Sequence, residues 1–144
     1  MHGLTIIQPW ATLIATGMKR YETRSWATHS LGPIAIHAGR RTKQAEEYIG
    51  EVMDAAPAVF DAIGVEDADD LPFGCVIATG WLTGCLATAG LPVDDMERAL
   101  GDFSPGRFAW RIDRVSRLTT PVPMRGAPGL WPVDAALFPR KETP

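Results

Sequence analysis

The chain has 144 residues, of which 46% are hydrophobic and 22% are charged, and its formal net charge is -3. This length accommodates one domain with a core of its own, and the composition argues against wholesale disorder. No apolar run approaches the ~20 residues of a membrane-spanning helix, and the first residues lack the charged-then-apolar layout of a signal peptide. We expect a single cytoplasmic domain over residues 1–144, with a frayed tail from about residue 139.

The first forty residues predict three strands and one helix. Residues 4–7 are typical of a short strand, and Pro9 is placed where a helix begins. Trp10, Leu13 and Ile14 then follow helical spacing, and Gly17 is a candidate for the end of this helix. A second strand runs through residue 26, and a third covers residues 33–38.

The remainder alternates between helical and strand patterns. Thr42 is a candidate N-cap for a helix that reaches residue 56, and a shorter helix follows Pro57. Residues 64–72 form an acidic loop, and residues 74–89 predict a long strand bent at Gly80 and Gly84. Asp94 begins a helical turn or two. Residues 107–118 predict a strand, and residues 121–132 a loop rich in proline and glycine. Together these elements favour an α+β domain around a small barrel.

The charges are distributed unevenly along the chain. Residues 17–41 carry five basic side chains against one acid, and residues 103–126 repeat that ratio. Residues 42–102 between them carry thirteen acids and two bases. We expect the two basic segments to meet and form one site for an anionic ligand; the alternative is that each is a solvated strand face. The acidic middle argues against wrapping of duplex DNA, which rewards a continuous basic face.

Nothing in the sequence indicates a disulfide, a metal site or a cofactor site. If Cys75 and Cys85 lie on one strand, ten residues separate them by ~33 Å, beyond any disulfide, and we expect buried thiols. The three histidines are scattered, and no Cys-x-x-Cys or His-x-x-x-His occurs. No phosphate-binding loop or dinucleotide fingerprint is present either. We therefore expect neither a metal nor a cofactor.

Residues 17–24 place an ammonium, a carboxylate and a guanidinium within six positions: Lys19, Glu22 and Arg24. Glu22 and Arg24 are two apart, so on an extended strand they point to the same face. Lys19 joins them only if the chain still turns at Gly17, which a glycine permits. Such a cluster beside tryptophans suits a small polar ligand with a phosphate or a carbonyl group. The alternative is a surface strand with an Arg-Glu pair, which stabilises little.

The string Gly-x-Lys-x-x-Glu-x-Arg follows Gln-Pro-Trp-Ala at residues 8–11 and precedes Gly-Pro-Ile-Ala-Ile-His-Ala at residues 32–38. Gly-Arg-Phe-Ala-Trp, Pro-Met-Arg-Gly and Gly-Leu-Trp then begin at residues 106, 123 and 129. This series of motifs resembles the ASCH domain family over about residues 4–135. The resemblance implies a PUA-like fold, with a small β-barrel and two or three helices packed on its outside.

The resemblance also implies a site at Lys19, Glu22 and Arg24, which would be catalytic residues if the protein is an enzyme. Lys19 would bind phosphate or polarise a carbonyl, and Arg24 offers a planar fork for phosphate or a base edge. Glu22 would accept from an amine or orient a water; its alternative role is a counter-charge for the two cations. We prefer Trp26 as a stacking wall, then Trp10. The expected ligand-binding set is Gln8, Trp10, Lys19, Glu22, Arg24, Trp26, His37, Arg40 and Arg125, although a core or strand-end role is the more common one for a histidine such as His37.

Three functions compete. The first is a binding module for single-stranded RNA or for a nucleoside or nucleotide, with no membrane partner. The second is a metal-independent hydrolase at the same three residues, either an amidohydrolase for N4-acylated cytidine or a ribonuclease. The amidohydrolase motif resembles Lys-x-x-Thr, whereas this chain has Glu22 in place of the threonine, which argues against amide hydrolysis. The third is a transcription-related adaptor that binds other proteins.

Overall fold

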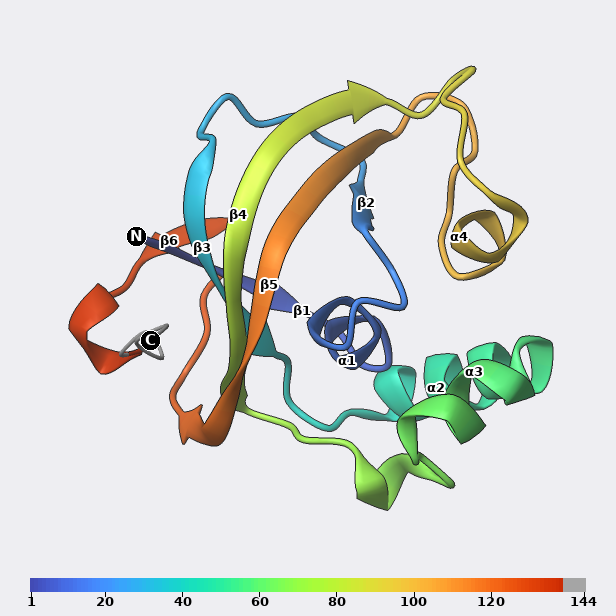
Figure 1. Ribbon diagram of the computed structural model, residues 1–144, viewed down its shortest axis with the longest axis horizontal. Coiled ribbons are helices and arrows are strands. Elements are labelled where there is room, and N and C mark those ends of the chain that lie inside the picture. The colour runs from blue at the N-terminus through green and yellow to red at the C-terminus, as the bar shows by residue number, and fades with distance from the viewer. Residues whose placement is uncertain (139–144) are drawn as a thin grey trace, which may run out of the picture.

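The computed structural model describes residues 1–138, so the predicted frayed tail lies outside the described residues. Within them, six strands form one sheet that curls into a half-barrel, and the long strands β4 and β5 curve around helix α1 (Figure 1). The order across the sheet is β2-β5-β4-β3-β1-β6. Strands β1 and β3 are parallel, and all other neighbours are antiparallel. The strands are β1 His2–Ile6, β2 Tyr21–Arg24, β3 Gly32–Ala38, β4 Cys75–Ala87, β5 Phe108–Pro123 and β6 Leu130–Pro132.

The described residues contain four α-helices, at the four helical segments of the sequence pattern and one or two more than the two or three that the family resemblance implies. The hydroxyl of Thr42 accepts from the backbone N–H of Ala45, and the carboxylate of Asp94 accepts from that of Glu97, so both predicted N-caps are confirmed. The helices are α1 Trp10–Ala15, α2 Lys43–Ala55, α3 Pro57–Ile63 and α4 Asp95–Ala99, with 3₁₀ turns η1 Ala68–Asp70 and η2 Ala135–Leu137. The α+β class with a small curled barrel is therefore confirmed.

Two segments predicted as loops contain regular structure. The acidic loop of residues 64–72 includes η1, because Asp67 and Asp70 form a capping box that satisfies the backbone N–H groups there. The Pro/Gly-rich segment of residues 121–132 includes the end of β5 and all of β6. Strand β6 forms because it pairs with β1 at the edge of the sheet, a long-range partner that local composition does not reveal.

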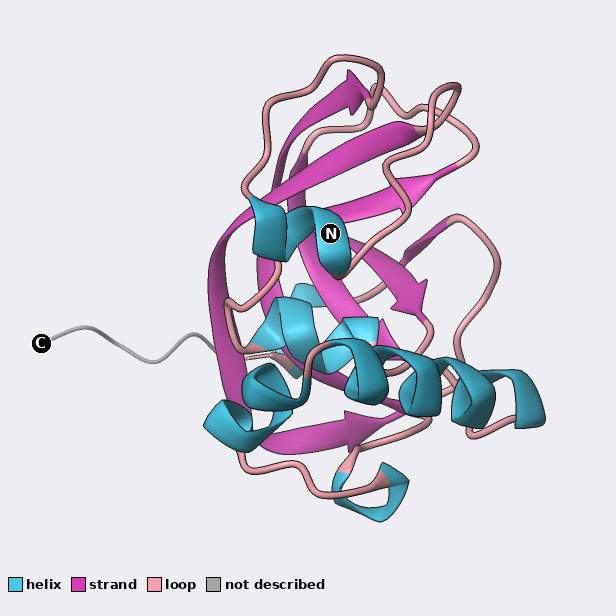
Figure 2. Ribbon diagram, turned by 90° about the vertical axis from the view of Figure 1, so that its right-hand side faces the viewer, coloured by secondary structure: helices cyan, strands magenta, loops and turns pink. Residues whose placement is uncertain are grey.

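The core lies between the concave face of the sheet and α1. Ile14 of α1 packs there with Ile36, Leu82 and Trp110 from three strands, and all four are buried. A second cluster joins α1 to α2 and α3, which lie beside it at one end of the half-barrel (Figure 2). None of the helices in residues 1–138 has the length and apolar character needed to cross a bilayer.

Strand β4 carries the features predicted for it. Its pairing with β5 shifts register between Thr79 and Trp81 and again between Leu82 and Gly84, next to the two glycines at which the sequence predicts a bend. Cys75 and Cys85 lie on this strand and are both free; Cys75 is buried, whereas Cys85 is partly exposed.

The edge pairing of β1 with β6 depends on Gly3. Gly3 lies opposite Trp131, and a Cβ atom at Gly3 would lie 2.6 Å from Cε2 of that indole. We expect Gly3→Ala to displace the indole and lower the free energy of unfolding by about 1–3 kcal/mol in urea titrations. Gly50→Ala, at an exposed position of α2 with open space around it, is the control and should raise stability by up to about 1 kcal/mol. Equal stability of the parent and Gly3→Ala would contradict this packing.

Candidate functional site

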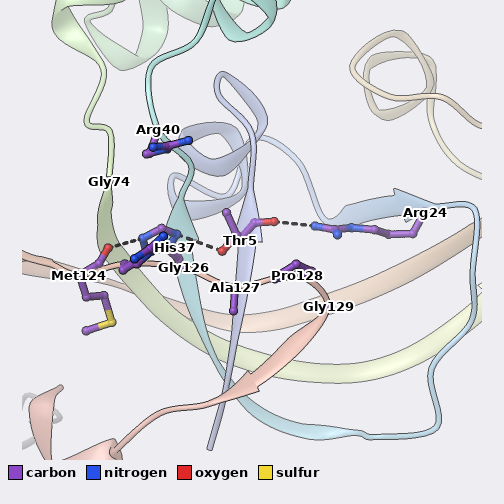
Figure 3. Close-up of a pocket in the computed structure, with 11 residues that line it drawn as sticks. Thr5, Arg24, His37, Arg40, Gly74, Met124, Gly126, Ala127, Pro128 and Gly129 are labelled. Atoms are coloured by element: carbon purple, nitrogen blue, oxygen red, sulfur yellow. Dashed lines mark hydrogen bonds between the residues drawn. The ribbon is translucent and has the colours of Figure 1, made fainter.

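Two neighbouring cavities share Thr5 and Arg24. We call the first, with a volume of about 780 Å³, the arginine cavity (Figure 3). The second, about 570 Å³, is the glutamate cavity. The arginine cavity is lined by Thr5, Arg24, His37, Arg40, Gly74 and residues 124–129. The glutamate cavity is lined by Thr5, Ile7, Trp10, Lys19, Glu22, Thr23, Arg24, Tyr48, Glu51, Gly101, Asp102 and Arg107.

Three arginines from separate parts of the chain converge on the arginine cavity. Arg24 ends β2, Arg40 follows β3, and Arg125 lies in the segment between β5 and β6. The two basic segments of the sequence therefore meet here. Among residues 1–138, no carboxylate lines this cavity, and neither Arg40 nor Arg125 forms an ion pair. Both are exposed, which leaves their guanidinium groups available to an anion.

His37 attaches the segment carrying Arg125 to the sheet. Its Nε2 lies 2.8 Å from the carbonyl oxygen of Met124, and its Nδ1 lies 3.1 Å from the hydroxyl of Thr5 (Figure 3). Because a carbonyl only accepts, Nε2 carries the proton in neutral His37, and Nδ1 accepts from Thr5. A Cβ atom at Gly126 would lie 2.8 Å from this Nδ1, so a glycine there permits the close approach. His37 thus lines the cavity and is also a buried structural histidine.

Arg24 lines both cavities and is held by two hydrogen bonds. One nitrogen, Nη2, donates to the carbonyl oxygen of Thr5 at 2.7 Å and to Oε2 of Glu22 at 3.1 Å. Three strands lie between β2 and β1 in the sheet order, so the contact with Thr5 crosses the open side of the half-barrel. The guanidinium carbon also lies 5.9 Å from the ring centroid of Trp110, which supports the side chain from the core.

Lys19 reaches the glutamate cavity because the chain turns before β2. Gly17 adopts a left-handed conformation with φ of 80°, which is the turn that the motif requires. Lys19 is only 2% exposed, and its Nζ lies 2.8 Å from Oε2 of Glu97. The other oxygen of Glu97 accepts from the backbone N–H of Arg20 at 2.6 Å. The sequence did not reveal this partner: Glu97 is one of thirteen acids in the middle segment and lies 78 positions away.

Glu22 is a nearly buried carboxyl between two cations. Burial raises the pKa of Glu22 above its ordinary value, and the charges of Arg24 and Lys19 offset this only in part. Its neighbours favour the ionised form, while the loss of water favours the neutral form. Glu22 is therefore a buried hydrogen-bond acceptor that faces the cavity, as well as a counter-charge for Arg24.

The structure separates the two candidate tryptophans. Trp10 lines the glutamate cavity, where its ring lies 4.9 Å from that of Tyr48 and its Nε1 donates to the carbonyl of Leu100 at 2.8 Å. Trp26 lines neither cavity; it is 40% exposed and packs edge-on against Trp110 at 4.6 Å. The sequence did not indicate Tyr48 as a site residue, because its position also fits the helical repeat of apolar residues along α2.

Gln8 is fully buried and lines neither cavity. Its side-chain amide donates to the hydroxyl of Thr12 at 2.7 Å and to the carbonyl of Pro72 at 2.9 Å. Its oxygen accepts from the backbone N–H of Thr12. These bonds account for Gln8 within the fold, and we leave it out of the site.

Within residues 1–138, no three histidine, cysteine, aspartate or glutamate side chains gather into a group that could hold a metal ion.

Comparison with known proteins gives two findings. The family model for the ASCH domain matches residues 4–91, which is more than half of the chain. The human protein named activating signal cointegrator 1 (Homo sapiens) is 28% identical over 134 residues, and the protein of the same name from Mus musculus is 27% identical over the same length. Each alignment covers 93% of this chain but 22% of the relative, so the chain spans about a fifth of the length of these proteins.

The Lys19–Glu97 pair gives a test of how the cavity is held. Glu97→Ala leaves a buried ammonium without its counter-charge and should lower the free energy of unfolding by about 3–5 kcal/mol. Glu46→Ala, which removes an exposed partner of Arg41, should cost less than about 1 kcal/mol in the same denaturant titration. Equal effects of the two variants would contradict burial of the first pair.

Glu22 makes stability depend on pH. A carboxyl whose pKa is raised by folding stabilises the folded state fully at a pH below its pKa in the unfolded chain, which is near 4.5. This stabilisation is lost as the pH rises through the pKa in the folded state. The unfolding free energy of the parent minus that of Glu22→Gln should therefore decrease as pH is raised above about 4.5, and then level off. Glu51→Gln, at an exposed position beside the same cavity, is the control. A difference that grows with pH would mean that the fold prefers the ionised carboxyl.

Proposed function

This chain belongs to the ASCH domain family, and we propose that its two cavities bind single-stranded RNA or a free nucleotide. Membership of the family supports a general RNA-binding role. The observation that carries the finer proposal is the convergence of Arg24, Arg40 and Arg125 on one cavity that no described carboxylate lines. In this proposal the arginine cavity takes the phosphate and the glutamate cavity takes the base.

The arginines suit a phosphate for two reasons. A guanidinium presents a planar fork of N–H donors that matches two phosphate oxygens, and Arg40 and Arg125 have no ion-pair partner among residues 1–138. Arg24 is already engaged by Glu22 and Thr5, so it defines the boundary and contributes its remaining donors. Binding at this cavity therefore depends mainly on Arg40 and Arg125.

The second cavity suits an unpaired base. Its volume of about 570 Å³ is that of a small-ligand pocket, and Trp10 and Tyr48 form an aromatic wall on which a base can stack. A base in a duplex is stacked and paired, so it cannot enter without leaving the helix. This geometry favours single-stranded over double-stranded nucleic acid.

The other two functions have less support. As a catalytic base Lys19 would need to release its proton, yet its ammonium is ion-paired with buried Glu97. The name of the relatives refers to a signal cointegrator, but each is far longer than this chain, so the adaptor function stays a prediction.

The proposal is tested by fluorescence anisotropy with a short labelled single-stranded RNA. We expect Arg40→Ala and Arg125→Ala each to weaken binding by about tenfold. Each variant should also make the dependence on salt shallower, by ~0.7 in log–log slope for each phosphate that the protein no longer neutralises. Arg117→Ala, which removes an exposed arginine of β5 outside both cavities, is the matched control. An equal effect of all three variants would show that only overall charge matters. No binding by the parent would instead favour the adaptor function.

A further inference from the structure

Two charged side chains of the glutamate cavity are almost completely removed from solvent. Lys19 is 2% exposed and Glu22 is 9% exposed, yet both line the cavity. They lie within electrostatic reach of each other, because the charge of Lys19 lowers the pKa of Glu22 against the larger effect of burial. Buried ionic groups stabilise a fold less than apolar side chains of similar size do. A ligand that bonds to both would account for their presence.

Each group keeps unused hydrogen-bonding capacity. An ammonium has three N–H donors, and Lys19 gives one to Glu97. A carboxylate accepts up to about four hydrogen bonds, and Arg24 accounts for one on Glu22. Gly101 lets the ammonium pack directly against the backbone, since a Cβ atom there would lie 2.6 Å from Nζ of Lys19. The cavity therefore offers two acceptor positions next to a donor.

We propose that the glutamate cavity selects guanine, with Glu22 accepting from N1–H and the N2 amine and Lys19 donating to O6. This inference rests on the proposed function. Guanine is the base whose edge presents two adjacent donors and then an acceptor. Adenine and cytosine offer an amine beside a bare ring nitrogen, so one acceptor position of Glu22 stays unfilled. Uracil offers one N–H between two carbonyls, which places an oxygen against the carboxylate.

The remaining lining groups are compatible with a purine. Trp10 and Tyr48 supply the wall, and Trp10 is fixed because its Nε1 donates to the carbonyl of Leu100. Nε of Arg107 lies 3.4 Å from Oδ2 of Asp102, so these two side chains neutralise each other at the rim of the cavity. Arg24 is shared with the arginine cavity, so a base held by Glu22 has its phosphate on the side of Arg40 and Arg125.

The test is competition by GMP, IMP, AMP, CMP and UMP against a labelled single-stranded RNA at pH 8. We expect GMP to compete about tenfold better than AMP, CMP or UMP, because the guanine edge alone fills both acceptor positions of Glu22. IMP lacks the N2 amine and should fall between GMP and the others. In Glu22→Gln the advantage of GMP over IMP should disappear, whereas it should persist in Glu47→Gln, which changes an exposed carboxylate of α2 outside both cavities.

The outcomes separate this inference from the function it rests on. If all five nucleotides compete equally while Arg40→Ala still weakens binding, the phosphate site stands and guanine selection is wrong. If another base competes best, or if GMP keeps its advantage in Glu22→Gln, the assignment to Glu22 and Lys19 is overturned. If no nucleotide and no RNA binds, both proposals fall. Thermal denaturation of Glu22→Gln verifies that the variant is folded, so that its loss of selectivity reports on recognition.

Discussion

One hydrogen bond closes the open side of the half-barrel: Nη2 of Arg24 to the carbonyl oxygen of Thr5, at 2.7 Å. The two strands it joins are separated by three others within the sheet, so the bond exists only because the sheet curls back toward itself. The same nitrogen bonds Glu22, and the guanidinium lies against Trp110 of the core. Fixed in this way, Arg24 lines both cavities together with Thr5.

The buried charged side chains around Arg24 are tolerated by the fold because each has a partner of opposite charge. Glu97 neutralises Lys19 and also accepts from the backbone of Arg20, so α4 is attached to the chain just before β2. Arg24 partly neutralises Glu22, whose pKa burial nevertheless raises. Desolvating such groups costs free energy that their mutual attraction only partly returns. A binding site, in which a ligand completes the hydrogen bonds, is a better account of this arrangement than stability alone.

The sequence was informative where the signal is local. Thr42 and Asp94 each cap a helix because the side chain and the N–H it accepts from are three residues apart. Charge segregation also predicted that the two basic segments meet, and Arg24, Arg40 and Arg125 from these segments line one cavity. What the sequence could not show depends on distant partners: the pairing of Lys19 with Glu97, strand β6 on β1, and the position of Trp10 rather than Trp26 at the cavity.

The central claim is that a ligand lies across Arg24, with its phosphate in the arginine cavity. An NMR titration of the ¹⁵N-labelled protein with a short single-stranded RNA tests this directly. The largest shifts should occur at the backbone amide of Thr5, at the side-chain Nε of Arg24 and at the backbone amides of Arg125, Gly126, Ala127 and Gly129. Shifts concentrated instead on the exposed outer part of β5, around Arg114 and Arg117, with the cavity signals unmoved, would contradict the account.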